Sequence, residues 1–350
     1  MTDTMTAAST TGSEGEELAS VVRDLLEGHA GIDHLKERLD AGSAHAPDLW
    51  RRLAGIGLVS ALVAEEHGGV GLGPADLAPT LVALGEYALP EPFVETAVVG
   101  ATVLGEFAAR DARAAEWLAR LAAGDLLVAV AFEGRTGYVA YAADADLLLD
   151  LRQDGSVRVH AAGDLVVEEQ PAVDPLRPIA RVRPAGDGVL LGRSPELTER
   201  AWNLAVASTA CLLAGTARRL LTLTVEYVSL RHQFGRPVGS FQAVKHKLAD
   251  IAVRADMAVT GALDAVAASG APDAARRAAV AKAYAGDAAE RANDEALQLH
   301  GGIGFTWEHH LHFWLKRALS LGAAYGSTTE HRRRLARELL ESVAAEEAER

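Results

Sequence analysis

The chain of 350 residues contains a single cysteine, Cys211, and three methionines, and aromatic residues make up only 5% of it. One cysteine excludes an internal disulfide. Because Cys211 lies in an apolar helical run, the sequence predicts a small buried side chain there rather than a reactive thiol. The first 14 or so residues hold neither a basic start nor an apolar run, so no secretory signal is expected. A reducing, cytoplasmic location fits these absences.

Positive charge is also scarce. Lys and Arg number 34 against 48 Asp and Glu, which gives a net charge of −14. This charge opposes nonspecific binding to nucleic acid or to an anionic membrane and favours solubility. The longest apolar helical run, residues 202–230, carries Arg218, Arg219 and Glu226, so no membrane-spanning helix is expected. Neither nucleic acid nor a membrane is a predicted partner.

The periodicity of apolar residues changes along the chain and predicts its organisation. Residues 1–15, rich in Thr, Ser, Gly and Ala, are expected to be a disordered tail, and residues 16–123 repeat apolar positions at helical spacing. Residues 124–194 contain short apolar runs separated by Gly, Asp and Pro, which predict a small antiparallel β domain.

Helical periodicity returns after the start signal Ser194-Pro195-Glu196, so residues 195–350 are predicted to form a helical domain. Its four long helices are expected at about residues 199–230, 240–269, 272–300 and 325–347, with a short helix near 308–320. Their length predicts an antiparallel four-helix bundle.

One stretch between two predicted helices, residues 231–242 (RHQFGRPVGSFQ), has the composition of a ligand clamp. Arg231 offers a planar fork of donors that suits phosphate oxygens, and Phe234 offers a flat face for a heteroaromatic ring. The glycines allow the backbone to approach a ligand closely. Together these features suggest a nucleotide. Taken alone, the segment could equally be a turn that only joins two helices.

A second segment, residues 298–305 (QLHGGIGF), also ends a helical run in a Gly-rich turn. Its Q-x-x-G-G pattern, with the R-x-x-F-G and F-Q residues of the first segment, resembles the motifs of the acyl-CoA dehydrogenase family in order and approximate spacing. The resemblance is close over residues 202–337, recognisable in the N-terminal helices and weak in the middle. It implies a mainly helical protein with an N-terminal helical domain, a middle β domain and a C-terminal four-helix bundle.

The resemblance also implies FAD as the cofactor and an acyl-CoA thioester as the substrate, which the family desaturates between its α and β carbons. Each FAD of the family lies between subunits: one subunit supplies the flavin pocket and the base, and its neighbour holds the pyrophosphate and adenine. In this chain the matching positions imply the neighbour's contacts, which are Arg231, Gln233, Phe234, Phe241, Gln242, Gln298, Gly301 and Gly302.

The residues that should form the flavin pocket and supply the base do not match the family. Counted from Gly302, the place of the usual glutamate base is taken by Tyr325, or by Gly326 if the alignment slips by one residue. A phenol with a pKa near 10 stays protonated at neutral pH, so Tyr325 is a poor base. Glu330, the nearest acid, is expected to face solvent on the last helix. No catalytic residue is therefore predicted.

Neither an alternative base nor the flavin-facing segments of the family can be recognised in the sequence. Some relatives carry the base on the helix before the arginine clamp, but residues 202–224 contain no acid, and Ala205 lies near the expected place. The flavin-facing segments of the family have no recognisable equivalents, residues 128–134 being the closest to one of them.

His309, His310 and His312, near His300 and Glu308, match no standard metal spacing and are predicted to form a solvated turn without a metal.

These patterns favour a noncatalytic subunit that completes the FAD site of a paralogous catalytic subunit, in an α2β2 heterotetramer. The chain resembles the short subunits of heteromeric actinobacterial enzymes that act on CoA esters of steroid side chains, and the resemblance implies an electron acceptor protein. Two alternatives stay open at this point. One is a homo-oligomeric dehydrogenase with a displaced base, and the other is a scaffold or regulatory paralogue without a ligand.

Overall fold

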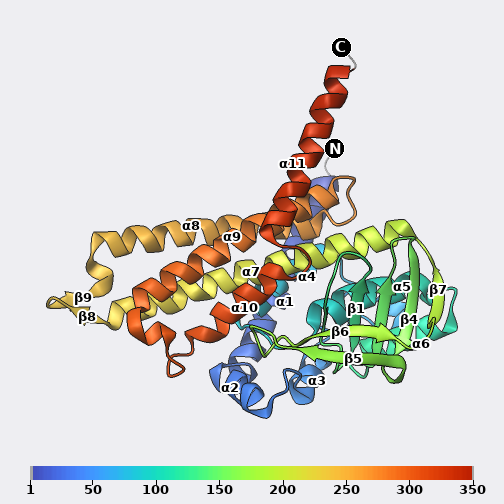
Figure 1. Ribbon diagram of the computed structural model, residues 1–350, viewed down its shortest axis with the longest axis horizontal. Helices are drawn as coiled ribbons and strands as arrows, with labels where there is room; N and C mark the ends of the chain where they lie inside the picture. Colours follow the sequence, from blue (N-terminus) through green and yellow to red (C-terminus); the bar gives the residue numbers. More distant parts are fainter. Residues whose placement is uncertain (1–2, 349–350) are drawn as a thin grey trace.

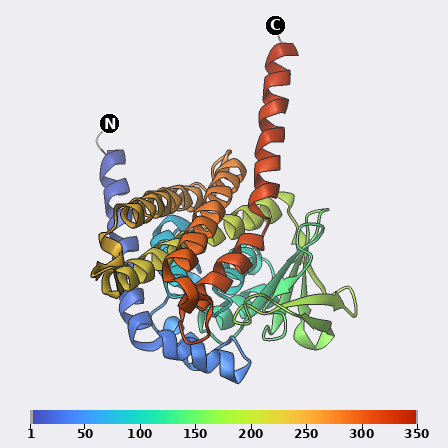
Figure 2. The same ribbon diagram turned by 60° about the vertical axis from the view of Figure 1, so that its left-hand side comes forward.

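The computed structural model describes residues 3–348 and is mainly helical. In both views the long helices α7 (Pro195–Leu230), α8 (Gln242–Ala267) and α9 (Ala274–His300) lie side by side (Figures 1 and 2). The sheets of the middle region lie toward one end of these helices, and the β8–β9 hairpin (His232–Gln233 and Arg236–Pro237) lies at the other. The end of α11 (Thr328–Ala348) projects away from the body.

The N-terminal region is helical, as its periodicity predicts. Its elements are α1 (Asp3–His29), α2 (Ile32–Ala41), α3 (Pro47–Gly55), the short turn η1 (Glu65–His67), α4 (Pro74–Glu86), the π-helical segment η2 (Val94–Gly100), α5 (Ala101–Ala108) and α6 (Ala112–Ala122). Helix α1 differs from expectation because it extends into residues 1–15, which were predicted to be disordered. Ser and Thr are common in linkers, but each costs only about 0.5 kcal/mol inside a helix that continues from a buried segment.

Close contact between α4 and α7 depends on two glycines. A Cβ atom at Gly85 would lie 2.2 Å from the carbonyl oxygen of Leu212, and one at Gly215 would lie 2.0 Å from that of Val82. Any larger side chain would therefore separate the helices. The hydroxyl of Thr216 fills the remaining space and donates to the carbonyl oxygen of Leu212 at 2.8 Å. This contact places α7 in the centre of the core, where most of its residues are buried.

The middle region contains two small sheets. The larger has the order β1 (Val128–Phe132), β3 (Leu147–Leu151), β4 (Ser156–Ala161) and β7 (Val189–Arg193), and the smaller has the order β2 (Val139–Ala140), β6 (Ile179–Pro184) and β5 (Leu165–Gln170). The prediction of a purely antiparallel unit is wrong at one pair, because β1 and β3 are parallel. Strand β2, which lies between β1 and β3 in the sequence, belongs to the smaller sheet. The chain therefore crosses back to the larger sheet before β3, which then runs parallel to β1.

The C-terminal helices begin and end close to the predicted places. Ser194 caps α7 by accepting a hydrogen bond from the Leu197 N–H, and Pro195 is the first helical residue. Helices α8, α9 and α11 follow, with α10 (Leu311–Ala323) between the last two. By length and composition α7 could cross a membrane, contrary to the sequence expectation, but 78% of its most apolar window is buried within the protein. That burial is typical of a core helix.

One buried arginine joins three parts of the chain. Arg317 of α10 donates through Nε to Asp174 Oδ2 at 2.5 Å and through its terminal nitrogens to the carbonyl oxygens of Leu89 and Leu176. Leu89 follows α4, and Asp174 and Leu176 lie in the loop before β6. All the polar bonds of this guanidinium are therefore made between regions that are distant in sequence.

We expect Arg317→Ala to lower the free energy of unfolding by about 3–5 kcal/mol, because the carboxylate of Asp174 would remain buried without its partner. Urea denaturation of the two proteins would measure the difference. Arg218→Ala is the matched control, since its ion pair with Asp256 is exposed and is worth about 1 kcal/mol or less. Equal effects of the two substitutions would contradict the proposed role of Arg317.

Candidate functional site

The first predicted clamp segment forms a tight hairpin at the end of α7. The N–H of Arg231 donates to Tyr227 and closes the helix, and strands β8 and β9 then pair across a two-residue turn. The turn residues Phe234 and Gly235 both have positive φ angles, 52° and 77°, as such two-residue turns require. A phenylalanine with positive φ is uncommon, and this one is 91% exposed. The hairpin therefore presents an aromatic ring to the outside.

Aromatic and cationic groups continue from the hairpin to the start of α8. The Arg236 guanidinium lies 4.0 Å from the centre of the Phe241 ring, and Phe234 approaches the same ring edge-on at 6.3 Å. Phe241 precedes Gln242, the first residue of α8, and gives that helix no side-chain cap. No acidic residue lies in the first turn of α8. The free N–H groups of this helix start and the exposed Arg231 make this end of the bundle suited to an anion.

The second predicted segment lies at the same end of the bundle. Helix α9 ends at His300, and Gly301 leaves it with a φ of 62°, followed by the turn η5 (Gly301–Phe305). Tyr227, one turn before Arg231, stacks on His300 with ring centres 4.4 Å apart and an angle of 20°. This stack brings the two clamp segments together (Figure 1). Gln298, Gly301 and Gly302 are exposed there.

The side chains gathered at this end fit part of a dinucleotide. Arg231 forms no ion pair within residues 3–348, so its guanidinium is available for a phosphate. Phe234 offers a face for a heteroaromatic ring, and a Gly-Gly turn allows the backbone to approach a ligand. We call this surface, made of the eight predicted contact residues, the exposed clamp. It contains no base and could bind a cofactor without reacting with it.

The base position expected from the sequence, at Tyr325 or Gly326, lies in the turn between α10 and α11. Tyr325 is only 7% exposed, has a φ of 52°, and packs edge-on against Phe132 and Trp202 at 6.2 and 6.0 Å. Its hydroxyl donates to Glu95 Oε1 at 2.9 Å. Burial and the nearby Glu95 carboxylate raise the pKa of Tyr325 well above 10. The phenol therefore acts as a hydrogen-bond donor and not as a base.

Comparison with known proteins agrees with this geometry. The models of the N-terminal and C-terminal domains of acyl-CoA dehydrogenases match residues 12–125 and 197–340. The protein named acyl-CoA dehydrogenase IpdE2 of Mycolicibacterium smegmatis is 34% identical over 327 residues, covering 93% of this chain and 99% of the relative. The chain belongs to the acyl-CoA dehydrogenase family.

Two solved structures of this flavoprotein oxidoreductase family are close in fold. A chain of the ChsE4-ChsE5 complex from Mycobacterium tuberculosis superposes with a TM-score of 0.85 and 26% identity, covering 94% of this chain and 97% of that chain. A chain of the variant named Tcur3481-Tcur3483 steroid ACAD also gives a TM-score of 0.85 and 26% identity, over 95% and 99% of the two chains. Both structures carry the names of two proteins.

Glu330, the acid nearest to the expected base position in the sequence, faces solvent as expected. Glu330 is exposed and caps α11, accepting bonds from the backbone N–H of Ser327 at 2.7 Å and from its hydroxyl at 2.8 Å. These bonds lower the pKa of Glu330. Gly326, with a φ of 95°, has no side chain, and Ala205 is buried within α7. Tyr325, the first residue expected at the base position from the sequence, lies in the same turn as Gly326.

A buried carboxylate that contacts the Tyr325 hydroxyl is one that sequence reasoning missed. Glu95 lies in the π-helical segment η2, is almost fully buried, and accepts bonds from Tyr325 and, at 3.3 Å, from Arg177. The signal in the sequence was a single acid within the apolar run of residues 93–100. It was not recognised because its partner lies 230 residues away in the chain.

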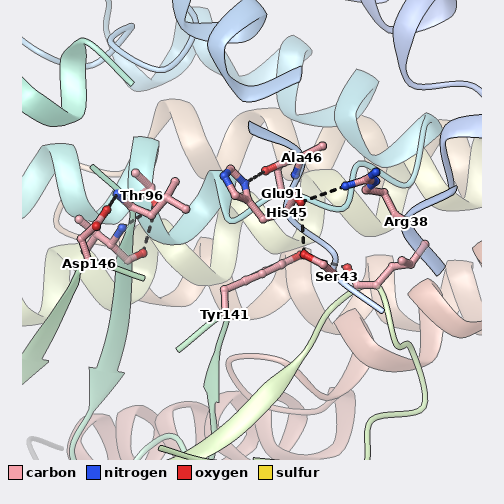
Figure 3. Close-up of polar contacts among 11 residues, drawn as sticks. Arg38, Ser43, His45, Ala46, Glu91, Thr96, Tyr141 and Asp146 are labelled. Atoms are coloured by element: carbon pink, nitrogen blue, oxygen red, sulfur yellow. Dashed lines mark hydrogen bonds and ion pairs between the residues drawn. The ribbon is translucent and has the colours of Figure 1, made fainter. Parts of the chain in front are cut away.

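A second buried acid nearby is fully engaged. Glu91 Oε2 lies 2.5 Å from Nδ1 of His45, and Glu91 Oε1 accepts from the N–H of Ala46 at 2.8 Å (Figure 3). Desolvation raises the pKa of Glu91. Burial alone would lower the pKa of His45, but the bond to Glu91 raises it. This pair fixes the loop before α3 against the turn after α4 and leaves no free carboxylate oxygen.

The space around these groups is small and polar. A cavity of about 20 Å³ remains, lined by Glu91, Glu95, Tyr141, Arg177, Arg317, Tyr325 and apolar neighbours. That volume is enough for about one water molecule. An open groove of about 390 Å³ is also lined by Tyr325, together with Arg177, Gly326, Glu330 and residues of the β1–β2 turn and α10. Arg135 at this groove pairs with Glu199 and lies over Trp202.

The histidine-rich turn after η5 is partly buried rather than fully solvated. His300, His309 and His310 pack ring against ring, with centres 4.8 and 4.7 Å apart. Desolvation lowers the pKa of all three, for His310 to about 4. Within the described residues, 3–348, no group of His, Cys, Asp or Glu is arranged to hold a metal. The neutral rings support the turn that carries Gly301 and Gly302.

A buried lysine holds the turn that carries Tyr325. Lys282 of α9 is fully buried, and its Nζ donates to the carbonyl oxygens of Gly322 at 3.0 Å and Gly326 at 2.9 Å. Burial lowers its pKa to about 7, and the charge of Arg177 adds to the effect. A neutral amine still has two N–H donors, which matches the two carbonyls.

The lowered pKa of Lys282 predicts how the stability of the protein changes with pH. Between the folded value near 7 and the ordinary value of 10.5, the unfolded chain binds a proton that the folded chain does not. Wild-type stability should therefore rise from pH 7 to pH 9 by about 2 kcal/mol relative to Lys282→Met. Denaturation at several pH values would measure it. Lys245→Met, at an exposed position on α8, is the control and should follow the wild type throughout. Parallel curves for wild type and Lys282→Met would contradict the prediction.

Proposed function

We propose that this chain is an acyl-CoA dehydrogenase subunit that supplies the exposed clamp to the FAD of a catalytic partner. The partner would provide the flavin pocket and the base, and the assembly would be an α2β2 heterotetramer. The reaction is the desaturation of an acyl-CoA thioester between its α and β carbons. FAD, when bound, takes up the hydride. In this proposal the chain's own residues bind and orient phosphate and adenine, and move no proton.

The proposal rests on the contrast between the exposed clamp and the surroundings of Tyr325. Arg231 and Phe234 of the exposed clamp are open to solvent. The base position instead holds a buried tyrosine whose hydroxyl is committed to Glu95, with a cavity of about 20 Å³ beside it. A site that reacts with a thioester needs a base within reach of the α carbon and room for the acyl group. The groove of about 390 Å³ that Tyr325 lines offers room beside this position, but the buried phenol there is no base. In this proposal the chain therefore keeps the cofactor-binding residues and lacks the base.

The names of the structural neighbours support a two-chain assembly and suggest the substrate. ChsE4-ChsE5 is described as a complex, and Tcur3481-Tcur3483 is described as a steroid ACAD. We propose a CoA ester of a steroid side chain as the substrate of the complete assembly. The electron acceptor would be a separate protein, and the location cytoplasmic.

A homo-oligomeric dehydrogenase with a displaced base is the second candidate, and Glu95 is the observation that favours it. Its carboxylate lies closest to the base position. Against this, it already accepts hydrogen bonds from Tyr325 and Arg177, and the cavity has no room for an acyl group. Purification of the chain alone separates the candidates: turnover of an acyl-CoA by this chain, lost in Glu95→Gln, would support the second and refute the first.

Arg231→Ala should reduce the FAD content of the complex purified with its partner. Loss of charge-assisted bonds to a phosphate costs about 1.5–3 kcal/mol, which weakens FAD binding about 10- to 100-fold. FAD released on denaturation, counted per pair of chains, measures the effect. Arg254→Ala, at an exposed position elsewhere on α8, is the control and should keep the full content. Unchanged flavin in Arg231→Ala would favour the alternative of a scaffold without a ligand.

A further inference from the structure

The buried groups around Tyr325 come from three separate parts of the chain. Glu95 belongs to η2 among the N-terminal helices, Arg177 to the loop before β6, and Tyr325 to the turn after α10. All three are less than 9% exposed. One carboxylate oxygen of Glu95 accepts from both Tyr325 and Arg177. A buried charge with these two donors is stabilised only while the three parts stay together.

The turn that carries Tyr325 is held from several sides. Lys282 donates to the carbonyl oxygens of Gly322 and Gly326, which flank Tyr325 in the chain. Nε2 of His331 lies 3.0 Å from the carbonyl oxygen of Tyr325 itself, at hydrogen-bond distance. Both Tyr325 and Gly326 have positive φ, a conformation that a tyrosine rarely adopts without such support.

The tyrosine ring fills space that would otherwise be empty. It packs edge-on against Phe132 and Trp202, whose own ring centres are 5.2 Å apart, and the cavity beside it measures only about 20 Å³. Other buried polar groups near it are already engaged. Arg317 is bound to Asp174, and the hydroxyl of Tyr141 points toward the carbonyl oxygen of Leu176 at 3.4 Å. The only group that Tyr325 would leave without its hydroxyl donor is Glu95.

We propose that Tyr325 is a fixed plug, seated by Lys282 and anchored by Glu95, that closes a latent pocket of phenol size inside this chain. Tyr325 lines both the small cavity and the open groove, at the position where the resemblance places the family's base, so an acyl group in the groove does not reach Glu95 while the plug is seated. This inference concerns the chain alone and holds whether or not the exposed clamp serves a partner's FAD.

Tyr325→Gly tests the plug directly. Glycine accepts the positive φ at this position, so the turn can keep its backbone while the ring is lost. An emptied cavity of roughly 100–150 Å³ is large enough to bind a benzene-sized molecule. We expect p-cresol at millimolar concentration to raise the Tm of this variant by several degrees, and toluene to raise it less because toluene cannot donate to Glu95. Neither compound should change the Tm of the wild type.

Phe107→Ala is the matched control, because it empties another buried aromatic site, on α5, where the lost ring has no hydroxyl and leaves no acceptor without its donor. In that variant toluene should stabilise at least as well as p-cresol. The plug is wrong if Tyr325→Gly gains nothing from p-cresol, or if toluene stabilises it equally well. It is also wrong if p-cresol raises the Tm of the wild type by the same amount.

A second measurement keeps the proposal testable if Tyr325→Gly does not fold. The chain has six tyrosines, which 3-fluorotyrosine labelling would report as separate ¹⁹F signals, with Tyr325→Phe identifying one of them. A soluble gadolinium chelate should leave the Tyr325 signal sharp in the wild type and broaden it in Lys282→Met. Broadening in the wild type would overturn the plug, and a sharp signal in Lys282→Met would overturn the role of Lys282.

Discussion

The hydrogen bond from Tyr325 to Glu95 is the constraint on which the rest of this structure depends. A buried carboxylate is unfavourable unless it is paired, and here the donors come from the loop before β6 and from the turn after α10. Satisfying one charge therefore fixes the N-terminal helices, the β region and the C-terminal bundle against one another. The same residues fill the interior beside Tyr325, where only about 20 Å³ remains. One set of hydrogen bonds therefore both joins the regions and keeps the phenol of Tyr325 buried.

Local patterns in the sequence were sufficient for most of the helices and for the two turns in which the residues of the exposed clamp lie. That these residues bind FAD stays a prediction. The signal Ser194-Pro195-Glu196 marks the start of α7, and the glycines near Arg231 and Gln298 mark two helix ends. Contacts between distant segments were not predictable in this way. Glu95 was missed because neither residue of the pair with Tyr325 signals its partner. The parallel pairing of β1 and β3 was missed because it depends on β2 joining the other sheet.

The exposed apolar side chains near the exposed clamp are as informative as the burial of Tyr325. Leu230 and Phe234 of the first segment are 80% and 91% exposed, and Phe305 and Trp307 beyond the second are 75% and 69% exposed. Large apolar side chains gathered at one place, together with a phenylalanine at positive φ, are unfavourable in an isolated chain. They become favourable when a partner or ligand covers them. This end therefore has the features of a contact surface, whereas the surroundings of Tyr325 have those of a core.

Helix α9 separates the turn of Tyr325 from the exposed clamp, so the first can change while the second stays the same. Lys282, in its first half, holds the turn of Tyr325, and Gln298 and Gly301, at its end, belong to the exposed clamp. At 1.5 Å per residue, Lys282 and Gly301 are about 28 Å apart along the helix axis. No side chain spans that distance, and the two places share no residue. The geometry of the exposed clamp therefore does not depend on which residue occupies position 325, so under the proposed function a chain with a buried phenol there can still offer its clamp to a neighbour.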